Sequence, residues 1–229
     1  MFDINKVAIV TVRQTLEPAF PDSPIKPSTF PDADGKGKYI LYANNGGTDA
    51  VIDTHQSQAN RIEPAFDNSG LIPDHVIKVG EDTVPLTHVG HRVADAAVRF
   101  SDRAEIVASA LTAFAKGDSL PLAKLAPTTL VFGTWDSRTN SGATGVKVVR
   151  QFNSEIRATN VTEVPAAGQF VSSIPRPDDL TNTVLSEEGM LDCPYSSLSK
   201  KNPCAPGGVI VHGEIVRTAT LNVRGAFAK

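Results

Sequence analysis

The chain has 229 residues, a formal net charge of −3, and ordinary fractions of hydrophobic (41%) and charged (21%) residues, as a globular protein has. The acidic balance argues against an autonomous nucleic-acid-binding module, and no apolar run approaches the roughly 18 residues that a membrane span needs. Two cysteines make no disulfide framework, so we expect a cytoplasmic protein without a membrane partner.

Three elements are predicted toward the N-terminus. Residues 6–18 alternate with both faces mostly apolar, which predicts a strand in the middle of a sheet. Residues 53–62 predict a helix, with Asp53 or Thr54 as its N-cap. This helix opens with amides and hydroxyls, where surface helices ordinarily carry Glu and Lys. Residues 74–88 predict a β-hairpin with its turn in the Gly-Glu-Asp segment.

Two further helices are predicted, over 91–100 and 101–117. The first carries an apolar stripe of Val93, Ala97 and Phe100. The second begins with Asp102 and Glu105 in the spacing of a capping box and ends at Gly117. We expect these helices to cover one face of a sheet.

Strands dominate the rest of the prediction. Residues 128–137 predict a strand that runs into a turn, and residues 138–145 predict a glycine-rich loop. Residues 146–153 fit a helix or a strand, whereas 154–164 and 207–223 alternate as strands do. The order of strand, helices and further strands predicts an α+β fold.

Motifs of common enzyme classes are missing, so we predict no cofactor and no metal site. The sequence has no phosphate-binding glycine loop, dinucleotide fingerprint, nucleophile elbow or zinc-protease helix motif. Two groups could supply part of a metal site: His88, His91 and Asp95, and Cys193, Cys204 and His212. Nothing else in the sequence completes either group, so capping or core histidines and free loop thiols are the simpler interpretation. Asp136 could be a catalytic acid, but it more simply closes a turn.

Uncharged donors beside single arginines recur near the ends of the predicted elements. This pattern suits contacts to phosphates and sugars. Each arginine taken alone fits a solvated salt bridge equally well. Trp135 taken alone fits core packing as well as it fits stacking on a base or ribose. The candidate RNA-binding residues are Ser57, Gln58, Asn60, Arg61, Trp135, Ser137, Arg138, Arg150, Ser154, Arg157 and Arg217.

Several blocks of sequence carry a family resemblance. They are "VIDTHQSQANRIE", "HRVADAAVRFSD", "FGTWDSRTNSG", "VVRQFNSEIRATNVT" and "HGEIVRTATLNV", in this order between about residues 51 and 223. Together they resemble the backbone subunit of type I CRISPR interference complexes (Cascade), subtype I-U, now I-G. This subunit belongs to the repeat-associated mysterious protein (RAMP) superfamily.

The resemblance implies a single RRM-like (ferredoxin-like) palm over residues 1–229, with inserted web and thumb elements. We expect the insertions near 18–47, 67–88 and 165–208, where the connections are long. It also implies that several copies polymerise along one CRISPR RNA. Each copy would grip the sugar-phosphate backbone and present bases for pairing with target DNA, beside neighbouring copies and other subunits of the complex.

In this reading the protein is not an enzyme, because type I target strands are cut by a separate nuclease. The alternative is a metal-dependent RNase of the same superfamily that acts through a loop aspartate, for which Asp136, Asp53 and Asp49 are the candidates. A third possibility is an α+β enzyme with an unrecognised pocket. An acidic chain can still carry RNA, because many copies share one strand and each needs only a few phosphate contacts.

Overall fold

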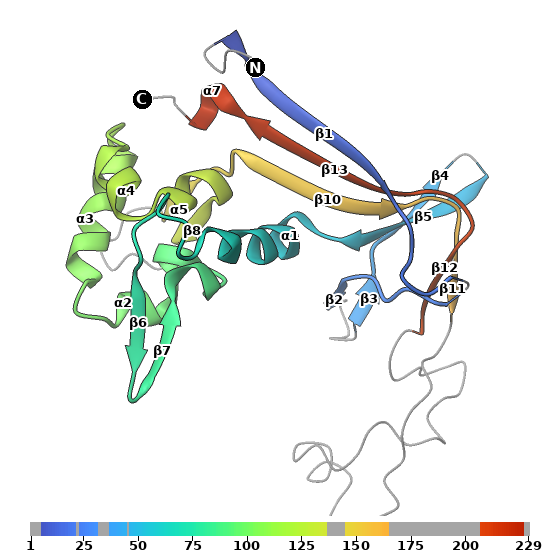
Figure 1. Cartoon of the computed structure of the whole chain (residues 1–229), viewed down its shortest axis with the longest axis horizontal. Helices are drawn as coiled ribbons and strands as arrows, with labels where there is room; N and C mark the ends of the chain where they lie inside the picture. The colour runs from blue at the N-terminus through green and yellow to red at the C-terminus, as the bar shows by residue number, and fades with distance from the viewer. Residues whose placement is uncertain are drawn as a thin grey trace, which may run out of the picture. The chain divides into compact units, whose positions relative to one another are not determined.

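The chain divides into two compact units, each assembled from separate segments of the sequence. The computed structural model describes residues 6–21, 23–31, 37–44, 46–136, 145–164 and 207–226 (Figure 1). Unit 1 comprises Met1–Gln14, Thr54–Glu155 and Arg217–Lys229, and unit 2 comprises Thr15–Asp53 and Ile156–Val216. No helix among the described residues is long and apolar enough to cross a membrane.

A five-stranded sheet has the strand order β1-β13-β10-β5-β4. Its strands are β1 (Ile9–Leu16), β4 (Leu41–Asn44), β5 (Gly47–Asp53), β10 (Phe152–Ala158) and β13 (Ile215–Asn222). Both β4 and β10 pair antiparallel with β5, where Ala50 lies opposite Leu41 on one side and Ala158 on the other. Helices together with a central antiparallel sheet confirm the α+β class.

Strand β1 lies at the edge of this sheet, so the prediction of a central strand over 6–18 was wrong. Most of its side chains are exposed, including Ile9 (61%) and Val12 (47%). β-Branched residues favour the extended backbone wherever the strand lies. Apolar alternation therefore identified the strand but could not show how much of it is covered.

Helix α1 (His55–Ile62) begins where the sequence predicted. The hydroxyl of Thr54 accepts a hydrogen bond from the Ser57 backbone N–H at 3.3 Å, so Thr54 is the N-cap. The chain continues directly into the 3₁₀ helix η2 (Glu63–Phe66), which has Pro64 in its first turn. Because proline lacks an N–H and fixes its φ angle, it is tolerated at the start of a helix but not inside one.

The predicted hairpin over 74–88 is confirmed. Strands β6 (Val76–Val79) and β7 (Asp82–Pro85) pair antiparallel, with Val79 opposite Asp82 across the turn. Gly80 has a φ of +63°, which glycine adopts at no steric cost. The hairpin leads into the 3₁₀ helix η3 (Leu86–His88), and Figure 1 shows it extending from the helical part of unit 1.

The predicted helix over 91–100 is broken into the 3₁₀ helix η4 (Arg92–Ala94) and the short helix α2 (Ala96–Arg99). Arg92 has a φ of +52°, which no residue of a right-handed helix adopts. Asp95 instead caps α2 by accepting from the Ala97 N–H at 3.0 Å. Phe100 is 91% exposed, so the predicted apolar stripe was wrong at that residue.

Helix α3 (Ala104–Ala115) confirms the helix predicted over 101–117, and Gly117 follows it with a φ of +95°. The predicted capping box was wrong. The N-cap position is Arg103, and no side chain bonds there to the first free N–H groups.

The strand predicted over 128–137 is mostly helical. Residues 127–132 form α5 (Pro127–Phe132), and only β8 (Thr134–Asp136) is a strand, which pairs with β9 (Val146–Val148). Pro127 takes the first helical position, where its fixed φ suits a helix. Burial of Thr129 and Phe132 then outweighs the strand preference of Thr and Val. Residues 138–144 of the predicted loop lie outside the described residues.

One core cluster lies in unit 1, where the helices α3, α4 (Leu120–Leu125) and α5 pack next to β9. Its buried members are Val93, Val98, Val107, Ala110, Leu111, Leu122, Ala126 and Val148. The chain ends its described part with α7 (Val223–Ala226). Val148 of β9 belongs to this core, so the core holds β9 and its partner strand β8 in place.

Unit 2 has a separate core of Ala50, Ala158, Val161, Val209 and Ile215. Its short strands pair antiparallel as β2 (Thr29–Pro31) with β3 (Gly37–Tyr39) and β11 (Val161–Val164) with β12 (Gly208–Val211). The single strand predicted over 207–223 is therefore interrupted between β12 and β13. A turn there is held by the Gly213 and Glu214 N–H groups, which donate to the carbonyl and hydroxyl oxygens of Thr159.

Gly133 joins α5 to β8 in a conformation that only glycine tolerates. Its φ is +78°, and a Cβ at this position would lie 2.8 Å from the Arg150 backbone nitrogen. We expect Gly133→Ala to destabilise the protein by about 1–3 kcal/mol or more, because backbone strain and a steric clash add together. Gly117→Ala is the matched control, since Gly117 also has a positive φ but open space around it. Urea denaturation should show a clearly smaller loss for Gly117→Ala; equal losses would contradict the close approach.

Candidate nucleic-acid interface

An open cleft of about 720 Å³ lies in unit 1, where α1, η4, α5, β8 and β9 meet. It gathers three of the predicted RNA-binding residues, Asn60, Trp135 and Arg150, from three separate parts of the sequence. The described residues that line it are Gln56, Asn60, Gly90, His91, Arg92, Phe132, Gly133, Thr134, Trp135, Lys147, Val148, Val149 and Arg150. No carboxylate occurs among these lining residues, although the whole chain is acidic.

Strands β8 and β9 supply an aromatic ring and two cations to the cleft. Trp135 and Lys147 lie directly opposite each other in the antiparallel pair, and Arg150 follows the end of β9. The indole of Trp135 is 66% exposed, so it is not a core residue. The Thr134 hydroxyl donates to the His91 carbonyl at 2.8 Å, which joins β8 to the segment before η4.

The outer face of α1 forms the opposite wall. The Gln56 amide donates to the Asn60 side-chain oxygen at 3.2 Å and to the Gly90 carbonyl at 3.3 Å. Gln56 and Asn60 are four residues apart, so they share one helical face. These bonds fix neutral donors and acceptors at the rim of the cleft.

Arg92, which lines the cleft, belongs to a buried ion pair. The Arg92 Nε and the Glu63 Oε2 are 2.6 Å apart, and the two side chains are 2% and 1% exposed. Arg92 also donates to the Gly133 carbonyl at 3.0 Å and lies over the Phe132 ring at 5.3 Å. The pair therefore ties the end of α1, η4 and the α5–β8 junction together.

Burial dominates the ionisation of this pair. It raises the pKa of Glu63, and the positive charge of Arg92 opposes that shift, as does a hydrogen bond from Thr128. Burial also lowers the pKa of Arg92, while Glu63 acts in the opposite direction and the nearby charge of Arg150 lowers that pKa further.

Three other predicted residues form a hydrogen-bonded network inside unit 1. The Ser154 hydroxyl donates to the Gln58 side-chain oxygen at 3.0 Å, and Arg217 Nε donates to the same hydroxyl at 3.0 Å. Arg217 also donates to Gln14 at 2.9 Å. Ser154 and Gln58 are 1% and 7% exposed. In this arrangement they hold α1 against the strands, and their contact with RNA stays a prediction.

The remaining predicted residues are dispersed. Ser57 supplies the N–H that Thr54 caps, and Arg61 is exposed on α1. Arg157 belongs to unit 2, where its guanidinium lies 5.3 Å from the centre of the Tyr42 ring. Ser137 and Arg138 lie outside the described residues. RNA contact by these five residues stays a prediction.

The aspartates proposed for RNA cleavage all make structural contacts. Asp136 is paired with Arg99 at 3.3 Å, and it is 6% exposed. Asp49 accepts from the Asn44 amide and from the Asn160 N–H. Asp53 is buried at the end of β5. These contacts hold turns and strand ends, which is the simpler role that the sequence suggested for Asp136.

The candidate metal ligands are also separated. His88 bonds to Asp67, Asp95 caps α2, and His91 lines the cleft. His212 bonds to the Thr162 hydroxyl, whereas Cys193 and Cys204 lie outside the described residues. Within the part of the chain that the structure describes, no three His, Cys, Asp or Glu side chains gather as a metal site would require.

Sequence reasoning missed His91, Thr134 and Lys147 as cleft residues. Lys147 had a signal, since it lies three residues before Arg150 in a segment that is otherwise apolar. Its position opposite Trp135 depends on the β8–β9 pairing, which no local pattern specifies. His91 and Thr134 come together through one hydrogen bond between distant segments.

The cleft combines an exposed aromatic ring, side-chain amides and two cations that have no ion pair among the described residues. This combination is typical of a nucleic-acid-binding groove. Residues 10–163, more than half of the chain, match the model of the family described as CRISPR-associated protein GSU0053 (Cas_GSU0053). The protein therefore belongs to this CRISPR-associated family and has a role in CRISPR defence. A search of curated proteins found no match.

We expect Glu63→Gln to lower the free energy of unfolding by about 3–5 kcal/mol, because it leaves the Arg92 guanidinium buried without its counter-charge. The control is Arg103→Gln. It breaks a 4.0 Å pair with Asp102 whose side chains are 70% and 87% exposed, and such pairs contribute about 1 kcal/mol at most. Urea denaturation measures both variants. A loss for Glu63→Gln as small as that of the control would contradict the role of this pair.

A second prediction concerns Asp67, which accepts from the Thr87 hydroxyl at 2.5 Å and bonds to His88 at 2.7 Å. The Thr87 hydrogen bond is the main cause that lowers the pKa of Asp67. A lowered pKa in the folded state stabilises the protein above the unfolded pKa, near 4, and this stabilisation is lost as the pH falls. Urea unfolding should therefore show that the free energy of unfolding falls less from pH 7 to pH 3 in Asp67→Asn than in the wild type. An equal fall in both proteins would contradict this role of Asp67.

Proposed function

We propose that this protein is the non-catalytic backbone subunit of a type I CRISPR interference complex, and that the unit 1 cleft binds the CRISPR RNA. The observation that carries the proposal is the composition of the cleft. Among the described residues, Lys147 and Arg150 have no ion pair, none of the lining is acidic, and Trp135 is exposed beside them. The resemblance to Cascade backbone subunits and the family match agree with this role.

Each part of the cleft suits one part of a nucleotide. The cations of Lys147 and Arg150 would attract phosphates, and the face of Trp135 would stack on a base or ribose. The amides of Gln56 and Asn60 are suited to phosphate oxygens and 2′-hydroxyls. None of these contacts depends on the identity of a base, which is what a carrier of many different guide sequences needs.

The proposal includes assembly. A chain with a net charge of −3 and few phosphate contacts would bind a short RNA weakly as a single copy. Several copies on one strand would add contacts between neighbours, so that affinity accumulates along the RNA. We propose that the five-stranded sheet belongs to an RRM-like palm and that the complex works in the cytoplasm, where it presents the RNA to target DNA alongside other subunits.

We expect Lys147→Ala with Arg150→Gln to weaken RNA binding and to reduce its salt dependence. Each phosphate contact on a single strand contributes about 0.7 to the slope of log K against log salt, so two lost contacts should reduce the slope by about 1.4. Trp135→Ala should cost about 1–3 kcal/mol if its ring stacks on a base. The measurement is titration of RNAs of graded length at several salt concentrations, with the number of bound copies determined at each length.

Matched controls separate the cleft from general charge and exposure. Lys78→Ala with Lys124→Ala removes two exposed positive charges from β6 and α4, and Phe100→Ala removes an aromatic ring that is 91% exposed. Equal effects of the control and cleft variants would refute the assignment of the cleft. One bound copy at every RNA length would refute the backbone role. Cleavage of RNA in Mg²⁺ by the wild type but not by Asp136→Asn would favour an RNase instead.

A further inference from the structure

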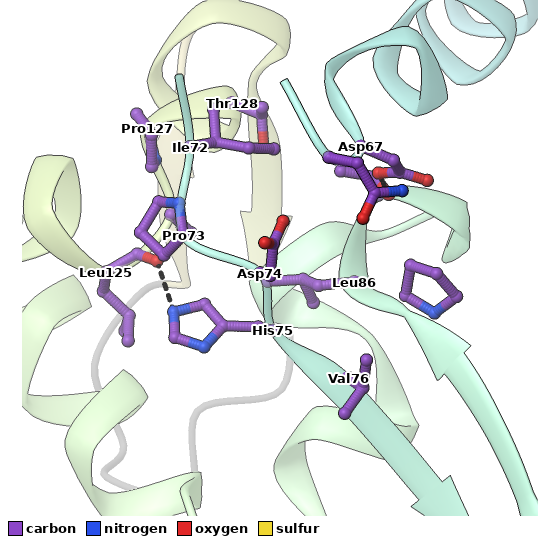
Figure 2. A pocket seen from close by; sticks show the side chains of 14 residues that line it. Asp67, Ile72, Pro73, Asp74, His75, Val76, Leu86, Leu125, Pro127 and Thr128 are labelled. Atoms are coloured by element: carbon purple, nitrogen blue, oxygen red, sulfur yellow. Dashed lines mark hydrogen bonds between the residues drawn. The ribbon is translucent and has the colours of Figure 1, made fainter. Parts of the chain in front are cut away.

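A second pocket lies in unit 1, between the segment that precedes β6 and the junction of α4 with α5 (Figure 2). Its volume is about 150 Å³. Pockets for cofactors and drug-sized ligands have volumes of about 300–1,000 Å³, so this one has room for a single long side chain. Its lining includes Asp67, Ile72, Asp74, His75, Leu86 and Leu125.

Apolar groups that have little freedom to move form most of the wall. Pro73, Pro85 and Pro127 have a fixed φ, and they lie in the lining with Ile72 and Leu86. The His75 ring donates from Nε2 to the Leu125 carbonyl at 2.9 Å, drawn as the dashed line in Figure 2. The two sides of the pocket are therefore bonded together and the space between them is preformed.

Two carboxylates, Asp67 and Asp74, lie in the lining of this pocket. Asp67 is held by Thr87 and His88, as described above. Figure 2 shows Asp74 between Ile72 and Asp67 in this view, and its side chain is exposed. Among the described residues, Asp74 has no hydrogen-bonding or ion-pairing partner. A single carboxylate without a partner beside apolar walls is the complement of a side chain with an aliphatic stem and a cationic end.

We propose that this pocket receives one arginine or lysine side chain of another protein, with the aliphatic stem along the prolines and the cationic group against Asp74. The carboxylates would repel a phosphate, so the pocket does not suit the RNA that we assign to the cleft. The chain itself is acidic, and its complement is a basic segment of a partner protein. This inference goes beyond the proposed function and does not depend on RNA binding.

The first test uses small probes on the intact chain. Amide NMR shifts are followed during titration with N-acetyl-arginine methylamide, with the lysine analogue, and with the neutral citrulline analogue of the same shape as arginine. We expect millimolar binding of the cationic probes, with shifts at Ile72, His75 and Leu86. Asp74→Asn should weaken this binding about two- to fivefold, because it removes the charge and keeps the shape.

Asp102→Asn is the control, since Asp102 is an 87% exposed carboxylate in the turn before α3. The proposal is overturned if citrulline binds as tightly as arginine, or if Asp74→Asn behaves like Asp102→Asn. Shifts of the same residues on adding a short RNA would overturn the choice of a protein partner. Self-association of the wild-type chain in sedimentation that Asp74→Asn abolishes would replace that partner with a second copy of this chain.

Discussion

The arrangement of the cleft depends on one buried ion pair. Glu63 follows α1 directly, Arg92 begins η4, and the Arg92 guanidinium also holds the Gly133 carbonyl between α5 and β8. Three segments that are distant in sequence therefore meet at one side chain. Burying both charges costs several kcal/mol per ion, and the short contact and the hydrogen bond to the Gly133 carbonyl offset that cost. The positive φ of Arg92 adds backbone strain, which persists because these contacts determine the position of the residue.

The neighbours of this pair suit the anion that we propose for the cleft. Arg92 is neutralised by Glu63, but Arg150 is near enough to lower the pKa of Arg92, and Lys147 lines the same cleft. Positive charges held close together repel one another in the free protein. A phosphate between them would replace repulsion with attraction, and it would cost no rearrangement where the walls are already bonded together.

Local features of the structure could be predicted from the sequence, whereas features set by distant contacts could not. The Thr54 cap, the β6–β7 turn and the stop at Gly117 each depend on a few neighbouring residues. The helix α5 was read as a strand because Thr and Val favour strands, and burial decided otherwise. The members of the cleft were partly predictable by residue type. Their meeting was not, because it requires the β8–β9 pairing and the contacts of Arg92.

The amides at the start of α1 lie on two faces of the helix, and each face favours them for a different reason. Gln58 points inward, where it accepts from Ser154 in a buried site, and a charged Glu or Lys there would lose its hydration without a counter-charge. Gln56 and Asn60 lie on another face and line the cleft. A Glu at either position would add a carboxylate to the cleft that holds Lys147 and Arg150, and it would weaken the attraction that we propose for a phosphate. Neutral amides therefore suit both faces for different reasons: the cost of a buried charge on one and, under the proposed function, a positive potential on the other.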